Sequence, residues 1–212
     1  MISKCWYASY GSNLSRERFM CYIEGTKPKY AKQKQSGCRD RNGPMGDEKI
    51  VIPYDLYYAE HSSKWDGGVA FISSEKNKKI KTLGRMYLIT VEQFIDVMLQ
   101  ENAKDPSDFY VLLDLDKVKE KEKYDTGLGW YGSILYLGDK DGIDIFTITT
   151  ASGHKKSDYR PPGENYLRTI IEGLRETYDM PDPEILAYFK NSDGIKGNLT
   201  DEWLMGVIES TS

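Results

Sequence analysis

Tyr7-Ala8-Ser9-Tyr10-Gly11-Ser12-Asn13-Leu14 is the stretch of this chain that decides its fold. The small and aromatic run from Cys5 to Tyr10 is typical of a buried strand, and Gly11 allows the backbone to turn and to approach a ligand closely. Helical composition resumes after it, with Asn13 or Ser15 suited to cap the helix. A strand, a tight turn and a helix N-terminus together expose backbone N–H groups that suit a carboxylate, a phosphate or an oxyanion. The stretch therefore predicts either an anion-binding loop or an ordinary strand-to-helix turn.

Glu101 is a candidate catalytic residue because of its position on a second predicted helix. Thr90 and Gln93 fit a capping box that starts this helix. The apolar residues that follow recur at helical spacing, and Glu101 continues their row beyond Phe94 and Met98. A carboxylate at the end of a buried row is a candidate general base. The alternative is a solvent-facing carboxylate on a frayed helix end.

Length and composition are those of one globular domain over residues 1–212, with 22–49 as a long loop or lid and 195–212 as a C-terminal tail. The net charge of -4 argues against nucleic acid or a membrane as a partner. No apolar run approaches the length of a membrane span, and the N-terminus has no secretion signal. We therefore expect a cytoplasmic protein, either a monomer or a homodimer.

The order of the predicted elements indicates the fold class. Strands dominate the first two thirds of the chain and helices dominate the end, without alternation, so the class is α+β. The predicted strands cover 5–10, 50–60, 69–72, 83–89, 109–115, 130–137 and 143–150. The predicted helices begin near residues 15, 90, 163, 182 and 200.

Other catalytic chemistries have weaker support in the sequence. A nucleophilic Ser12 needs a base, and nothing in the sequence places His61 or His154 beside it. No His, Cys or Asp residues have metal-ligand spacing backed by a second pair, so we expect neither a metal nor a cofactor. The segment 127–132 fits the pattern Gly-x-Gly-x-x-Gly, but it precedes a strand where a dinucleotide site requires a helix.

The loop Tyr10-Gly11-Ser12-Asn13-Leu14, between a strand and a helix, resembles the signature loop of the gamma-glutamylcyclotransferase-like superfamily. The resemblance extends from residue 5 to about residue 190, and it departs from the family at Asn102, where the family has glycine, and over 25–49. Four further features follow in the family's order: Trp65-Asp66-Gly67-Gly68-Val69-Ala70, Gly84-Arg85-Met86-Tyr87-Leu88, the helix that ends in Glu101, and Pro161-Pro162-Gly163-Glu164-Asn165-Tyr166.

This resemblance implies a small mixed β-barrel with surrounding helices and a site at one barrel end. It also implies cyclisation of a gamma-glutamyl amide to 5-oxoproline with release of an amine or amino acid, as in glutathione metabolism, and Glu101 as the group that moves the proton. The implied substrate-binding residues are Tyr10, Gly11, Ser12, Asn13, Leu14, Ser15 and Tyr166. Two alternatives remain open: a related enzyme for a gamma-glutamyl amine or acylated metabolite, and a catalytically silent binding module of the same fold.

Overall fold

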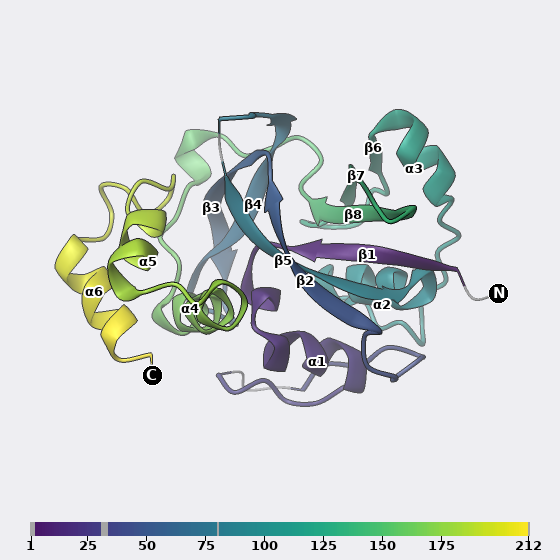
Figure 1. Cartoon of the computed structure of the whole chain (residues 1–212), viewed down its shortest axis with the longest axis horizontal. Helices are drawn as coiled ribbons and strands as arrows, with labels where there is room; N and C mark the ends of the chain where they lie inside the picture. The colour runs from purple at the N-terminus through teal and green to yellow at the C-terminus, as the bar shows by residue number, and fades with distance from the viewer. Residues whose placement is uncertain (1–2, 31–33, 80, 212) are drawn as a thin grey trace.

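The computed structural model describes residues 3–30, 34–79 and 81–211, which form a mixed α+β fold (Figure 1). The strands are β1 (Lys4–Ser9), β2 (Gly46–Ile52), β3 (Tyr54–Ser62), β4 (Gly67–Lys76), β5 (Thr82–Thr90), β6 (Lys123–Asp125), β7 (Ser133–Lys140) and β8 (Ile143–Thr149). The α-helices are α1 (Arg16–Glu24), α2 (Val91–Glu101), α3 (Leu115–Lys121), α4 (Glu164–Tyr178), α5 (Asp182–Phe189) and α6 (Asp201–Glu209). Two 3-10 helices, η1 (Ser12–Leu14) and η2 (Lys156–Asp158), complete the elements of the described residues.

Strand β1 lies inside a six-stranded sheet with the order β2-β5-β1-β8-β7-β6. It pairs antiparallel with β5 and parallel with β8. Because side chains alternate along a strand, Trp6 and Ala8 enter one hydrophobic core while Cys5 and Tyr7 enter another. Both faces of the sheet are therefore buried at β1, which explains the nearly continuous apolar run that begins the chain.

Helices cover the two faces of the sheet in two groups. The first core joins one face of the sheet to β3, β4 and the helices α4, α5 and α6, which lie together at one end of the molecule (Figure 1). The second core joins the other face to α1 and α2 and includes Val118 of α3. The loop after β1 lies between these groups, because η1 packs against both α1 and α4.

The expected closed β-barrel is wrong for this chain. Within the described residues the six-stranded sheet stays open, with β2 and β6 at its edges, and β3 and β4 pair only with each other. Pro53 is the one residue between β2 and β3, and its fixed φ and missing N–H redirect the chain out of the first sheet. The β3–β4 ribbon contacts β8 through a side chain instead: Thr149 Oγ1 donates to the Ile72 carbonyl at 2.8 Å and accepts from its N–H at 3.3 Å.

Two strand predictions also need correction. The strand expected over 50–60 is two strands in different sheets, because Pro53 separates β2 from β3. The strand expected over 109–115 is irregular, and Tyr110 and Leu112 are 80% and 86% exposed. This apolar run lacks a strand partner in the described part of the chain. Asp114 instead caps α3 by accepting from the backbone N–H of Lys117.

The predicted loop 22–49 is shorter than expected. Helix α1 continues to residue 24 and β2 begins at residue 46, so the connection covers 25–45, of which 31–33 lie outside the described residues. The guanidinium of Arg39 binds the buried carboxylate of Asp96 on α2, with Nη2 2.7 Å from Oδ1. Over the tail 195–212, the described residues include the helix α6. No helix in the described part of the chain has the length and apolar character needed to cross a membrane.

Candidate functional site

A cleft of about 720 Å³ lies where β1 ends and the chain turns into η1. Its walls come from segments far apart in the sequence: the end of β1 with η1, α1, residues 34–35 of the connection 25–45, the β3–β4 turn with the start of β4, the end of α2, the loop before β7, β8 and α4. Most of these segments belong to elements that pack into the two cores described above.

Six of the eight residues predicted from the sequence line this cleft. They are Tyr10, Gly11, Ser12, Asn13, Glu101 and Tyr166. Leu14 and Ser15 are not among the lining residues. Leu14 is fully buried in the first core, and Ser15 caps α1 by accepting from the backbone N–H of Arg18 at 3.3 Å.

Asn13 connects the loop to the carboxylate of Glu101. Its side-chain nitrogen donates to Glu101 Oε1 at 2.7 Å and lies 3.4 Å from the hydroxyl oxygen of Tyr7. The Asn13 carbonyl accepts from the hydroxyl of Tyr87 at 2.8 Å, which holds the loop against β5. The Asn13 side-chain oxygen is buried without a hydrogen-bond partner in the described residues. The loop and the half-buried carboxylate therefore form one connected unit.

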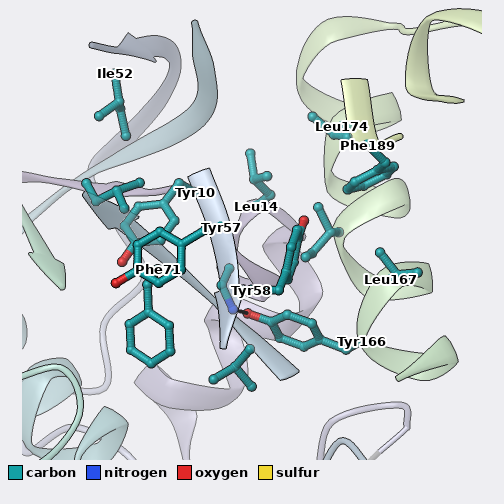
Figure 2. Close-up of a cluster of buried hydrophobic side chains, with 14 of the residues drawn as sticks. Tyr10, Leu14, Ile52, Tyr57, Tyr58, Phe71, Tyr166, Leu167, Leu174 and Phe189 are labelled. Carbon is teal, nitrogen blue, oxygen red and sulfur yellow. Dashed lines mark hydrogen bonds between the residues drawn. The ribbon is translucent and has the colours of Figure 1, made fainter. Parts of the chain in front are cut away.

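Tyr166 extends from α4 toward β4 (Figure 2), and it lines the cleft. Its hydroxyl oxygen accepts from the Ala70 N–H at 3.1 Å and from the backbone of Ser12. Burial raises the pKa of Tyr166, against the opposing effect of these amides, so the hydroxyl keeps its proton. Because the hydroxyl oxygen already accepts from two backbone donors, the hydroxyl proton is left to bond a different acceptor. Tyr166 is therefore a neutral hydrogen-bond donor at the cleft.

Gly11 is required because of the space that a side chain would need here. Its φ of -113° is accessible to any residue. A Cβ atom at this position would lie 2.9 Å from the Tyr166 hydroxyl oxygen and 3.4 Å from Ala70 Cβ. Glycine thus permits the close approach of the loop, α4 and β4 that narrows this end of the cleft.

Asn102, which departs from the family pattern, fixes one wall of the cleft. Its side-chain nitrogen donates to the Tyr131 carbonyl at 3.1 Å, and its oxygen accepts from the Tyr131 N–H at 2.9 Å. Its φ of -99° makes no demand for glycine. The Tyr131 hydroxyl donates to the Ala70 carbonyl at 2.9 Å. The glycine-rich segment 127–132 is thereby a cleft wall, a role that its sequence pattern did not reveal.

Several other lining residues were missed by sequence reasoning. Aromatic side chains from four elements or loops form much of the wall: Tyr7, Tyr22, Trp65 and Tyr131. Lys34 and Lys64 also line the cleft. Trp65 belonged to a segment that matched the family but carried no assigned role. The lysines gave no signal, because only the tertiary fold brings 25–45 and the β3–β4 turn together.

Neither histidine is positioned to activate Ser12. His154 Nδ1 lies 3.1 Å from the Tyr57 hydroxyl, and its Nε2 lies 3.0 Å from Glu60 Oε1. His61 is exposed on β3 and does not line the cleft. In the described residues, no group of three or more His, Cys, Asp or Glu side chains is arranged to hold a metal ion.

Comparison with known proteins shows the fold of this chain. No protein-family model matches it. Histone deacetylase 5 of Arabidopsis thaliana is 34% identical over 196 residues, which are 86% of this chain but 30% of that protein, so the chain spans less than a third of that relative.

Among solved structures, a gamma-glutamyl cyclotransferase superposes with a TM-score of 0.52 at 15% identity, covering 98% of this chain and 99% of that chain. An uncharacterised protein from Homo sapiens gives 0.49 at 16% identity, with coverage of 98% and 99%. The first of these shows that the chain has the gamma-glutamylcyclotransferase-like fold, which confirms the superfamily resemblance of the Tyr10–Leu14 loop at the level of fold.

Proposed function

We propose that this protein is a cofactor-independent gamma-glutamylcyclotransferase, which converts a gamma-glutamyl amide to 5-oxoproline and a free amine or amino acid. The main support is the 2.7 Å hydrogen bond between Asn13 and Glu101, because it places a carboxylate in the cleft beside the loop 10–13. A proton acceptor and nearby hydrogen-bond donors suffice for a reaction in which the substrate supplies its own nucleophile.

Glu101 moves the proton in this proposal. It takes a proton from the substrate α-ammonium, and the freed α-amine attacks the γ-carbonyl carbon to form the ring C–N bond. Glu101 gives this proton to the leaving nitrogen as its C–N bond to the γ-carbonyl carbon breaks. The ring nitrogen loses a second proton as it becomes an amide, and the released amine takes up that proton and leaves as an ammonium. No atom is gained or lost, because substrate yields 5-oxoproline and amine alone.

The loop and Tyr166 hold the charges of the glutamyl half. The Ser12 backbone already bonds the Tyr166 hydroxyl and the Leu14 N–H bonds the Gly11 carbonyl, so the proposal assigns the α-carboxylate or the oxyanion to the other backbone N–H groups of the loop 10–13. The Tyr166 hydroxyl adds a neutral donor at the same end of the cleft. Fixing the substrate in a ring-forming pose is worth roughly 7 to 11 kcal/mol of the barrier.

A catalytically silent binding module is the second candidate, since the fold alone is compatible with it. The Asn102 departure favoured this candidate in the sequence, but Asn102 supports the cleft wall through Tyr131 and so gives no reason for lost activity. The match to the plant histone deacetylase covers 30% of that protein, so deacetylase activity is not part of this proposal.

A screen for 5-oxoproline tests the proposal and separates the candidates. The purified chain is incubated with gamma-glutamyl amino acids, gamma-glutamyl amines and glutathione, and 5-oxoproline is measured by mass spectrometry. A cyclotransferase releases it from at least one class. Binding of these compounds without any 5-oxoproline would identify a silent module, and glutamate as the product would identify a hydrolase.

A further inference from the structure

Arg18 is a buried cation beside the cleft that has no carboxylate partner. The residue is 3% exposed, forms no ion pair among the described residues, and leaves its Nε atom without a hydrogen-bond partner. The other buried arginine, Arg85, is 8% exposed and binds the carboxylates of Asp47 and Glu176. Buried charges in proteins are normally paired. The contrast indicates that the partner of Arg18 comes from outside the chain.

The groups around Arg18 form a site suited to an anion. Its guanidinium carbon lies 4.2 Å from the centre of the Tyr22 ring and 5.8 Å from that of Trp65. With the Gln35 amide turned so that its oxygen faces the cations, this oxygen accepts from Lys64 Nζ at 2.5 Å and from both terminal nitrogens of Arg18 at 3.2 Å. Two cations thus converge on one oxygen atom, in the position that a carboxylate oxygen would occupy more favourably.

The charge balance of the cleft points the same way. Its charged lining residues among those described are Lys34, Lys64 and Glu101. Glu101 is held by Asn13 and forms no ion pair with Arg18 or Lys64 within 4.0 Å in the described residues. Arg18 adds another positive charge behind Gln35. Within the described residues, this part of the cleft therefore carries positive charge that no ion pair neutralises.

We propose that Arg18 and Lys64 form a subsite for a carboxylate carried by the leaving half of the substrate. This inference rests on the proposed function, in which Glu101 and the loop hold the glutamyl half and leave these two cations unused. The leaving group is then an amino acid or short peptide with a free carboxylate. A leaving group with an extra ammonium, such as a polyamine, is repelled by the same two charges.

Binding to the Glu101→Gln variant tests the subsite without turnover. Gamma-glutamylglycine and gamma-glutamylglycinamide differ only in the carboxylate, so their dissociation constants are compared by isothermal titration calorimetry. We expect the carboxylate compound to bind about tenfold to a hundredfold more tightly, the range for a charge-assisted hydrogen bond. Adding Lys64→Gln should reduce that ratio of dissociation constants to about threefold or less. Lys196 is an exposed lysine that does not line the cleft, so adding Lys196→Gln instead should leave the ratio unchanged.

Charge reversal provides a second variant that leaves the buried Arg18 in place. Lys64→Glu places a carboxylate where it can pair with Arg18, so it should abolish the preference for gamma-glutamylglycine over gamma-glutamylputrescine. The exposed side chain of Lys64 makes this variant compatible with folding. An unchanged preference in both Lys64 variants would overturn the proposal.

The outcomes also separate the subsite from the cyclotransferase reaction. Equal 5-oxoproline release and equal binding for the two glycine compounds would refute the subsite and retain the reaction. A Lys64-dependent carboxylate preference in binding, with no 5-oxoproline from the wild-type protein, would retain the subsite and refute the reaction. Failure to bind either compound would overturn both.

Discussion

Asn13 is the residue on which the site geometry depends most. Its backbone carbonyl is fixed by Tyr87 and its side chain holds Glu101, so a single residue joins β5, the loop and α2. A general base is effective only when it lies within hydrogen-bond reach of the proton that it removes. At the scale of single residues, the proposed mechanism therefore depends on the position of the Glu101 carboxylate, which Asn13 holds.

Replacing Glu101 by Gln tests that carboxylate directly. The substitution preserves size and hydrogen bonding but removes the proton acceptor, so 5-oxoproline formation should fall by roughly two to four powers of ten. Thermal unfolding should be nearly unchanged. Glu92→Gln is the matched control on the same helix, because Glu92 is exposed and its ion pair with Arg39, at 3.6 Å, is a surface one. Near wild-type turnover in Glu101→Gln would remove Glu101 from the mechanism.

Ser12→Ala distinguishes cyclisation from covalent catalysis. In our proposal the backbone of Ser12 contributes and its hydroxyl does not react, so turnover should change by less than about tenfold. The rate is measured together with intact-protein mass spectrometry of the wild type during turnover. Complete loss in the variant, with an acyl adduct on Ser12 of the wild type, would instead establish a serine nucleophile.

Lys64 makes the preference for a leaving-group carboxylate depend on pH. Protein atoms around the ammonium of this otherwise exposed side chain, and then repulsion from Arg18, lower the pKa of Lys64 to about 8, while Glu101 and Cys21 act in the opposite direction. The protonated form binds a carboxylate, so this attraction is present at pH 7 and declines as pH rises through about 8. KM for gamma-glutamylglycine should therefore rise between pH 7 and 9 relative to the glycinamide. A constant ratio across this range would contradict the assigned role of Lys64.

At the scale of elements, the contact between α4 and η1 holds the loop in place. Gly173 of α4 packs so closely on this loop that a Cβ atom would collide with the backbone of Leu14 and Ser15. Gly173→Ala should cost about 1 to 3 kcal/mol in unfolding free energy and also reduce turnover, because the loop must move. Urea unfolding and 5-oxoproline assays measure the two effects. Wild-type values for both would show that the contact is unimportant.

Gly206→Ala is the matched control on α6. Apart from the adjoining residues and the backbone of its own helix, a Cβ atom there would meet no atom of the described residues within 4 Å. Because alanine favours a helix over glycine, this variant should gain about 0.5 to 1 kcal/mol and keep full activity. The pair thus separates the effect of helix propensity from the effect of the close contact.

Short-range signals in the sequence predicted helix starts well, whereas the pairing of strands that are distant in the sequence was predicted poorly. The capping box of Thr90 and Gln93 forms as expected, since both of its hydrogen bonds lie within four residues. The strand expected over 109–115 failed because a strand requires a neighbour that its own pattern cannot supply. Pro53 was recognised as an edge residue, but the separation of β2 and β3 into two sheets depends on where each strand finds its partner.

At the scale of the whole molecule, the cleft combines segments that are distant in sequence. The loop 10–13, Glu101 and Tyr166 were found because they belong to recognisable motifs, and the fold brings them to one cleft. Arg18, Lys64 and Gln35 were missed because each is unremarkable in its own segment. Their shared position arises only when α1, the β3–β4 turn and the connection 25–45 pack together. The residues to which we assign the glutamyl half were thus readable from sequence, and those to which we assign the leaving half were not.

Product analysis with an N-acetylated substrate tests the proposed ring closure most directly. Acetylation of the α-amine removes the attacking nucleophile and leaves the scissile γ-amide intact. We predict that gamma-glutamylglycine gives 5-oxoproline and glycine, while its N-acetyl derivative gives no product under the same conditions. Cleavage of the N-acetyl compound to N-acetylglutamate and glycine would show that the protein is a hydrolase and would contradict the cyclotransferase assignment.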